Sequence, residues 1–258
     1  MIHVDVPTLA LRGGAIPVLG LGTWQAQHGA AERAVSAALQ LGYRHVDTAT
    51  MYGNEGEVGR ALSTVGIDRD DVFVTTKLPP ERVGREQRTL TESLIALNLD
   101  HVDLWLIHWP PGGQAAPRTW DEFRAARDEG LVRSIGVSNY SIRQIDELIE
   151  VTGEAPAVNQ IPYSPSDHDP ALLAAHRERG IVVEGYSPLK RSDLRAPALV
   201  DAAAAHDVTA AQVVLRWHVQ HDVVVIPKST DRERLAANLD VFGFELTDEE
   251  MARIDALG

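Results

Sequence analysis

Cysteine is absent from all 258 residues of this chain. Disulfide bonds, thiol nucleophiles and cysteine-ligated metal sites are therefore excluded. No apolar run approaches the roughly 18 residues that a membrane-spanning helix needs. The first residues, Met-Ile-His-Val-Asp, also lack the charged and apolar segments of a signal peptide. We therefore expect a cytoplasmic protein with no membrane partner.

Basic residues are scarce as well, because 24 Lys and Arg residues face 37 Asp and Glu residues and leave a formal net charge of -13. This excess of negative charge disfavours nonspecific binding to nucleic acids, so we expect no nucleic-acid partner. A local basic pocket for a phosphorylated cofactor is still compatible with it. The 44% of hydrophobic residues indicates a globular protein with a sizeable core.

Eight short apolar runs, rich in β-branched residues and bounded by turn residues, are typical of strands buried on both faces. They are Val18–Trp24, Tyr43–Ala49, Asp71–Leu78, Val102–Trp109, Ser134–Asn139, Ala157–Pro162, Ile181–Ser187 and Val223–Ser229. Between them the apolar residues recur with helical spacing. The predicted helices are Ala30–Leu41, Arg85–Leu99, Thr119–Glu129, Ser141–Val151, Pro170–Arg179 and Ala210–His221.

Alternating strands and helices favour a parallel sheet, and eight such units in 258 residues predict a single (β/α)8 TIM barrel over residues 1–258. The segment Leu9–Pro17 has apolar arms around a Gly-Gly turn and predicts a β-hairpin before the barrel. Pro110–Pro117 is rich in Gly and Pro and is predicted to be a loop at the rim. After a last helix, Asp248–Ala256, only a short C-terminal tail is expected.

Four polar side chains stand at the ends of three consecutive predicted strands: Asp47 closes the second and Tyr52 follows it, Lys77 closes the third and His108 closes the fourth. The carboxyl ends of barrel strands meet at one catalytic rim, so we expect the four to converge. A tyrosine has a pKa of about 10, and a nearby ammonium lowers such a pKa by roughly 1 to 3 units. Lys77, held by Asp47, would therefore help Tyr52 to donate a proton to a carbonyl oxygen. His108 would orient that oxygen.

Each of these residues has a simpler interpretation when it is taken alone. A lysine or aspartate at a strand end is usually half of an ion pair, a loop tyrosine usually packs, and a histidine after an apolar strand is usually hydrogen-bonded in the core. Their placement at three consecutive strand ends favours catalysis instead.

Three other patterns are rejected. Gly20-Leu-Gly22 resembles the start of a dinucleotide-binding fingerprint, but Gln25 stands where the third glycine belongs. His218 and His221 lie on one predicted helix, yet no third ligand stands nearby in the sequence, so we expect no metal. Ser187 is not a nucleophile of the Gly-x-Ser-x-Gly type.

The chain resembles the aldo-keto reductase family over nearly its full length and is most similar to bacterial members of the 2,5-diketo-D-gluconate reductase type. Five segments carry the resemblance: Gly20-Leu-Gly-Thr-Trp24, Gly42-Tyr-Arg-His-Val-Asp-Thr-Ala49 with Tyr52-Gly-Asn-Glu, Leu106-Ile-His-Trp-Pro110, Gly136-Val-Ser-Asn139 and Val225-Ile-Pro-Lys-Ser229. It implies reduction of aldehydes or ketones by hydride transfer from a nicotinamide. Tyr52 would be the general acid, tuned by Asp47 and Lys77, and His108 would assist.

The resemblance also implies which residues bind the nicotinamide cofactor. They are Ser138, Asn139, Gln160, Tyr186, Ser187, Leu189, Lys228, Ser229, Thr230, Arg234 and Asn238. Ser138, Asn139 and Gln160 would hydrogen-bond the carboxamide, and Tyr186 would stack on the ring.

Lys228, Ser229, Arg234 and Asn238 are implied to hold the adenosine end of that cofactor. Independently, Lys228 and Arg234 lie around the start of a helix after the last predicted strand, a common phosphate site in barrels. Two cations suit a 2′-phosphate, so we expect NADPH, with NADH binding more weakly. Some family members have a glutamate where this chain has Ala237, which removes one contact to the adenosine.

The expected substrate is a small carbonyl compound, and Trp24, Met51 and Trp109 are the candidate apolar walls of its pocket. Many relatives carry an aromatic residue where this chain has Pro79-Pro80, and the long tail that often closes the pocket is missing after Gly258. We therefore expect an open pocket in a monomeric protein.

Two other functions are considered. A nicotinamide-binding protein with little turnover, in a regulatory or structural role, would be marked by loss of one of the four rim residues, and none is lost. A barrel hydrolase would need carboxylate pairs or metal ligands at the rim, and the sequence shows neither.

Overall fold

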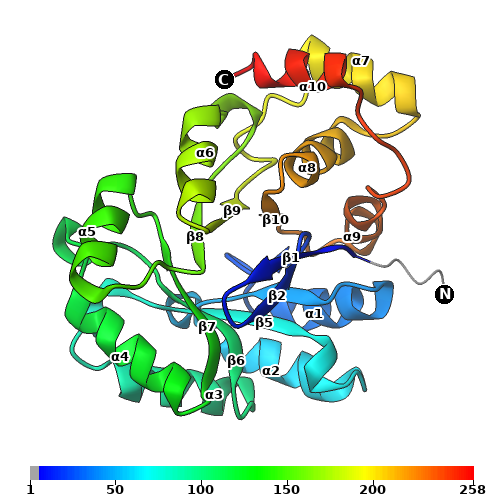
Figure 1. The fold of residues 1–258 in the computed structure, drawn as a ribbon. Coiled ribbons are helices and arrows are strands. Elements are labelled where there is room, and N and C mark those ends of the chain that lie inside the picture. The colour runs from blue at the N-terminus through cyan, green and yellow to red at the C-terminus, as the bar shows by residue number, and fades with distance from the viewer. Residues whose placement is uncertain (1–5) are drawn as a thin grey trace.

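The computed structural model describes residues 6–258 as a parallel eight-stranded barrel with helices around it and an antiparallel hairpin before it (Figure 1). This confirms the predicted (β/α)8 fold and the N-terminal hairpin. The barrel strands follow the order of the chain, and each is hydrogen-bonded to the next. They are β3 (Leu21–Gly22), β4 (His45–Asp47), β5 (Phe73–Leu78), β6 (Val102–Ile107), β7 (Val132–Ser138), β8 (Val158–Pro162), β9 (Val182–Tyr186) and β10 (Val224–Ile226).

All eight predicted strands are present, but most are shorter than their apolar runs. The backbone leaves the extended conformation once the chain passes the rim: Gln25 beyond β3 and Ser187 beyond β9 both have positive φ, at 62° and 56°. β7 instead begins two residues before the predicted Ser134. Apolar character therefore locates the strands, while local turns at the rim set their ends.

The barrel closes between its first and last strands. Leu19 forms a parallel bridge with Val225, whose N–H donates to the carbonyl oxygen of Val18 at 2.9 Å. The N–H of Gly20 donates to the carbonyl oxygen of Val225 at 2.9 Å. A Cβ atom at Gly20 would lie 2.6 Å from Nδ1 of His45, so only glycine allows this close approach.

Ten α-helices are assigned within residues 6–258, and they surround the barrel (Figure 1). They are α1 (Ala30–Leu41), α2 (Glu55–Thr64), α3 (Glu86–Leu97), α4 (Pro117–Asp128), α5 (Ile142–Thr152), α6 (Pro170–Glu178), α7 (Pro197–His206), α8 (Ala210–Gln220), α9 (Arg232–Leu239) and α10 (Asp248–Asp255). All predicted helices are confirmed, and Ser141 and Gln144 form the capping box expected before α5.

Sequence reasoning did not identify α2 and α7. Two glycines, Gly56 and Gly59, weaken the helical pattern of α2. A Cβ atom at Gly59 would lie 2.5 Å from the carbonyl oxygen of Leu97, so this glycine lets α2 pack closely on the end of α3.

Among residues 6–258 no single helix is long and apolar enough to cross a membrane, and α7 and α8, which reach that length together, are bent by 94°.

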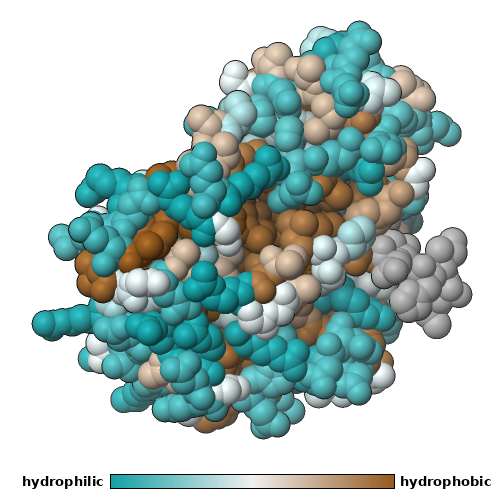
Figure 2. Space-filling view, in the orientation of Figure 1, coloured by the Kyte–Doolittle hydropathy of each residue, from teal (hydrophilic) through white to brown (hydrophobic). Residues whose placement is uncertain are grey.

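The hairpin of β1 (Thr8–Leu11) and β2 (Gly14–Pro17) covers the amino ends of the barrel strands. Its Ile16 is fully buried in a cluster with Phe73 and Val158, which stand at the beginning of β5 and β8. Figure 2 shows this face, with hydrophobic surface gathered around a hollow near its centre. A groove there is lined on its apolar side by Leu9, Ala10, Leu173, Ile181, Val182, Val183 and Val223.

Candidate active site

The four predicted catalytic residues meet at the carboxyl ends of three adjacent strands. Asp47 is the last residue of β4, Lys77 lies near the end of β5, and His108 directly follows β6. Tyr52 ends the short 3-10 helix Thr50–Tyr52 that follows β4. The expected convergence is therefore present in the structure.

Lys77 is the centre of this group and is fully buried. Its Nζ atom donates to both carboxylate oxygens of Asp47 at 2.7 Å and to the carbonyl oxygen of Thr48 at 2.8 Å. The same atom lies 3.4 Å from the hydroxyl oxygen of Tyr52. Burial alone would lower the pKa of Lys77, but its acidic neighbours, above all the charge and hydrogen bonds of Asp47, hold that pKa above its ordinary value. The lysine therefore stays charged beside the phenol.

The pKa of Tyr52 differs from the sequence-based expectation. Burial raises it above its ordinary value, and the neighbouring ammonium of Lys77 offsets this only in part. The expected net lowering of this pKa by Lys77 is therefore wrong. A raised pKa keeps Tyr52 protonated at neutral pH, which is the form a proton donor needs.

His108 faces the edge of the Tyr52 ring, with the two ring centroids 5.7 Å apart. Burial and the charge of Lys77 lower the pKa of His108 to about 3, so its imidazole is neutral at physiological pH. Its Nδ1 atom is buried and has no hydrogen-bond partner among residues 6–258. A neutral ring next to the phenol can orient a carbonyl oxygen without competing for the proton.

Beneath these residues lies a buried network that sequence reasoning missed. The side-chain nitrogen of Gln160 donates to Asp47 and to Glu184, both at 2.8 Å. Glu184 is fully buried, and its second oxygen lies 3.5 Å from Nε2 of His45. Burial and the charge of Asp47 raise the pKa of Glu184 to about 8, while burial lowers the pKa of His45 to about 3. The signal in the sequence was an acidic residue inside the apolar run Val182-Val-Glu-Gly-Tyr186.

Asp47, Tyr52, Lys77 and His108 are called the tetrad below. A cavity of about 440 Å³ opens beside it, and three tetrad residues, Asp47, Tyr52 and His108, lie in the cavity wall. Ten other predicted site residues also line it: Trp24, Met51, Trp109, Ser138, Asn139, Gln160, Tyr186, Ser187, Leu189 and Lys228. Gln25, Pro188, Lys190 and Pro227 line it too and were not predicted. Trp24, Met51 and Trp109 are each close to half exposed, so the pocket mouth is apolar and open.

The residues implied to bind the carboxamide already contact one another. Asn139 donates to the carbonyl oxygen of His108 at 3.1 Å and accepts a hydrogen bond from the hydroxyl of Tyr186 at 2.9 Å. Ser138 donates to the main-chain oxygen of Gln160 at 2.8 Å. The side-chain oxygen of Gln160 accepts no hydrogen bond from residues 6–258, so it is the group left for an amide donor.

Four predicted residues lie away from the cavity, at the β10–α9 turn and on α9: Ser229, Thr230, Arg234 and Asn238. Arg234 and Lys228 are exposed, and neither forms an ion pair with the part of the chain the structure describes. The side chain of Asp231 caps α9 by accepting from the N–H of Arg234 at 2.9 Å. An anion at this helix start would therefore depend on cationic side chains more than on that N–H group.

The rejected histidine pair does not form a site of its own. Nε2 of His218 lies 3.1 Å from the carbonyl oxygen of Tyr163, inside the core, whereas His221 lies at the end of α8 and faces other residues. The two rings therefore do not share a ligand position.

The family model described as "Aldo/keto reductase family" matches residues 18–258. The chain belongs to this family. It is 42% identical over 269 residues to a morphine 6-dehydrogenase of Pseudomonas putida, with 97% of this chain and 91% of that protein covered. A crystal structure of an aldo/keto reductase from Brucella melitensis matches with a TM-score of 0.95 at 41% identity, covering 98% of this chain and 100% of that chain. A Bombyx mori aldo-keto reductase in complex with NADP matches with a TM-score of 0.92 at 34% identity, over 98% and 93%.

Membership of the aldo-keto reductase family supports an oxidoreductase that acts on small carbonyl compounds with a nicotinamide cofactor. It does not favour the alternative of a binding protein with little turnover, since all four rim residues stand together as a catalytic group would.

Proposed function

We propose that this aldo-keto reductase uses NADPH to reduce aldehydes or ketones to alcohols, with Tyr52 as the proton donor. The observation that carries the proposal is the position of Lys77, which is 3.4 Å from the Tyr52 hydroxyl and 2.7 Å from Asp47. A buried, charged ammonium next to a phenol stabilises the negative charge that the phenol acquires as it gives up its proton. A site with only a packing role would not need a buried ion pair beneath an open cavity.

The residues around the cavity fit a nicotinamide dinucleotide. At one end the free side-chain oxygen of Gln160 can accept a hydrogen bond from the carboxamide, and the half-buried ring of Tyr186 offers a face for stacking. At the other end Lys228 lines the cavity, and Arg234 lies beyond it on α9. Both cations are exposed and neither forms an ion pair within residues 6–258, so they suit a 2′-phosphate, which supports NADPH over NADH. When bound, this cofactor supplies the hydride.

The protein's own part in the reaction is to hold the carbonyl oxygen and to deliver a proton. Tyr52 lines the cavity, and its hydroxyl would donate its proton to that oxygen as the alcohol forms. The neutral His108 ring, 5.7 Å from the Tyr52 ring between centroids, positions the oxygen. Asp47 keeps Lys77 charged and fixed, so the electrostatic stabilisation is in place before the substrate arrives.

The substrate class follows from the cavity mouth. Trp24 and Trp109 are 47% and 45% exposed, so they offer flat apolar faces without enclosing a small molecule. We therefore propose tighter binding of bulky aromatic or polycyclic carbonyls than of simple aldehydes. The 42% identical relative is named a morphine 6-dehydrogenase, after a polycyclic alcohol, which supports this choice. The 2,5-diketo-D-gluconate reductase type is the other subtype to test, and its substrate is a keto-sugar acid.

The test is a panel of carbonyl substrates assayed by consumption of NADPH and of NADH. It should include simple aldehydes, polycyclic ketones and keto-sugars. We expect turnover with NADPH, a lower KM for the polycyclic ketones, and millimolar KM values for simple aldehydes. Absence of turnover with every member, in protein that binds NADPH, would refute the reductase proposal. A lower KM for the keto-sugars would refute the polycyclic preference alone.

A further inference from the structure

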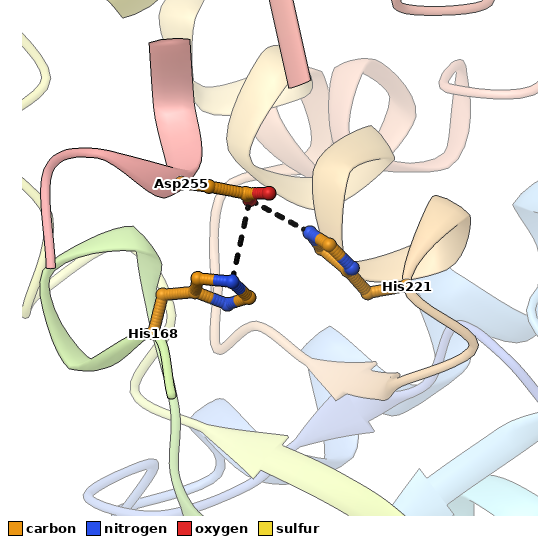
Figure 3. Close-up of side chains that lie close together, drawn as sticks. All are labelled: His168, His221 and Asp255. Carbon is orange, nitrogen blue, oxygen red and sulfur yellow. Dashed lines mark hydrogen bonds and ion pairs between the residues drawn. The ribbon is translucent and has the colours of Figure 1, made fainter. Parts of the chain in front are cut away.

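A cluster of metal-ligating side chains lies outside the active site, where three separate segments meet (Figure 3). His168 comes from the loop before α6, His221 from the end of α8, and Asp255 from the end of α10. The three side chains point toward one another, and one potential ligand atom of each lies within 4.8 Å of the others. Within residues 6–258 no other group of three such residues meets this distance.

We propose that His168, His221 and Asp255 bind one divalent transition-metal ion of the Zn²⁺ class. Two imidazole nitrogens and one carboxylate oxygen are a common ligand set for Zn²⁺, and a fourth position stays open for water. No residue of the set belongs to the tetrad or lines the cavity beside it. The site is therefore independent of the proposed reductase activity.

The distances in the cluster are close to those that a tetrahedral site requires. Oδ1 of Asp255 lies 2.8 Å from Nε2 of His221 and 3.7 Å from Nε2 of His168. With metal–ligand bonds of about 2.0 to 2.1 Å, tetrahedral geometry separates ligand atoms by about 3.3 Å. Both distances from Asp255 lie within about half an ångström of this value, and the ligand atoms of the two histidines lie within 4.8 Å of each other.

Neighbouring residues orient two of the ligands as expected around a metal. Nδ1 of His168 lies 2.8 Å from the hydroxyl oxygen of Tyr163, which can hold the proton on Nδ1 and leave Nε2 free. Trp217 donates its indole N–H to Oδ1 of Asp255 at 2.7 Å.

The cluster combines partial burial with access. The side chains of His168, His221 and Asp255 are 7%, 18% and 30% exposed, so an ion can enter from solvent. One cation lies nearby: Arg177 donates to the carbonyl oxygen of His221 at 2.6 Å and pairs with Asp222 at 3.6 Å. Asp222 therefore partly balances the charge of Arg177.

Bound metal would tie α10 to α8 and to the loop before α6. These segments meet here through side-chain hydrogen bonds and the apolar cluster around Trp217. An ion that binds only the folded chain raises its thermal stability, and the stabilisation grows with the logarithm of the ratio of ion concentration to Kd. The predicted consequence is a Zn²⁺-dependent rise in melting temperature.

The experiment is a calorimetric titration of Zn²⁺ into the full-length, chelator-treated and tag-free protein at neutral pH. We expect saturable binding of one ion per chain. Asp255→Asn keeps the side-chain volume and an oxygen for Trp217, and His221→Ala removes one nitrogen ligand. Each should raise the Kd by roughly tenfold or more and make the Zn²⁺-dependent rise in melting temperature smaller at every Zn²⁺ concentration.

The matched control is His206→Ala. His206 also bonds a carboxylate of α10, with its Nε2 atom 3.0 Å from Glu250, but it belongs to no group of three ligands within residues 6–258. This variant should bind Zn²⁺ like the wild type. Co²⁺ titrated into the wild type should also develop the visible absorption of a tetrahedral site, a readout that needs no variant to fold.

Two results would overturn the proposal. The first is no saturable binding of Zn²⁺ by the wild type, which would leave the cluster as a hydrogen-bonded contact of α10. The second is binding that is unchanged in Asp255→Asn and His221→Ala, which would place the ion elsewhere. Neither result bears on carbonyl reduction, because none of these residues contacts the tetrad.

Discussion

The two sides of the barrel rim differ in how far they are assembled before any ligand binds. On the side of β4 to β6, the Lys77 ammonium is buried, and its contacts to Asp47 and Thr48 are 2.7 to 2.8 Å long. On the side of β10 and α9, Lys228 and Arg234 are exposed and unpaired within residues 6–258. The catalytic residues are thus preorganised. The cations proposed to bind the cofactor's phosphate would form an ion pair only when the cofactor binds.

This difference has an energetic consequence. Removing one member of the buried side leaves another polar group without a partner in a region of low dielectric constant, so it affects stability as well as rate. Removing an exposed cation should change the stability of the folded protein little, and its effect should appear only in the affinity for the cofactor. The predictions below test this separation, beginning with the largest expected effect.

Lys77→Met should destabilise the protein by roughly 3 to 5 kcal/mol, because it leaves the buried Asp47 carboxylate without its partner. It should also abolish most of the reductase activity. Urea unfolding monitored by circular dichroism gives the stability. Replacing both residues, as Asp47→Asn with Lys77→Met, should recover part of the lost stability. A single variant as stable as the wild type would contradict the buried ion pair.

Glu184→Gln should change how stability depends on pH. The pKa of Glu184 is about 8 in the folded protein, above the value of about 4.3 in an unfolded chain. Between these two values the folded state keeps a proton that the unfolded state has released, so stability falls as pH rises by up to about 1.4 kcal/mol per unit.

The glutamine variant lacks this titration, so its stability should rise relative to that of the wild type across that window, by on the order of 5 kcal/mol in total. Urea unfolding at about pH 4.5 and at about pH 8.5 measures the difference. Parallel pH profiles for the two proteins would show that Glu184 does not hold a raised pKa.

Arg234→Ala should raise the Kd for NADPH by roughly tenfold or more and leave the Kd for NADH almost unchanged. A charge-assisted contact to the extra phosphate contributes on the order of 1.5 to 3 kcal/mol. Fluorescence titration measures both constants. Arg232→Ala is the matched control, because Arg232 lies on the same helix but contacts Gln40 at 3.2 Å. Equal weakening of both cofactors would show that Arg234 does not distinguish the phosphate.

Trp109→Ala should raise KM several-fold and lower kcat less, because it removes binding surface at the cavity mouth and leaves the tetrad in place. Trp24→Ala offers a contrast, since the Trp24 ring packs 4.8 Å from that of Tyr52 between centroids. This second variant should lower kcat as well. Loss of kcat with unchanged KM in Trp109→Ala would contradict an open, weakly binding mouth.

Much of the active site was predictable because it depends on one regularity of the fold. Asp47, Lys77 and His108 stand at strand ends, and the strand ends of a barrel share a rim, so their convergence followed from periodicity. The length of each strand was less accessible, because the turn at Gln25 is set by rim contacts that the apolar run does not encode. A cytoplasmic location and a monomeric state stay predictions.

What could not be predicted depends on contacts between distant segments. Glu184 is an isolated acid in a strand, and its role emerges only where Gln160 bridges it to Asp47. Likewise, His221 acquires its two neighbours, His168 and Asp255, from loops and helices that no local spacing connects. The direction of the Tyr52 pKa shift could not be predicted either, because it depends on how deeply the side chain is buried, and a sequence motif does not contain that information.

The most direct test compares Tyr52→Phe with the wild type in two measurements on the same protein: the Kd for NADPH and the single-turnover rate with a good carbonyl substrate at saturating NADPH. The substitution removes only the proton donor from the assembled side of the rim. We expect an unchanged Kd and a rate lower by about 10²- to 10⁴-fold, as for loss of a general acid. A Tyr52→Phe variant that turns over at nearly the wild-type rate would contradict the assignment of Tyr52 as the proton donor.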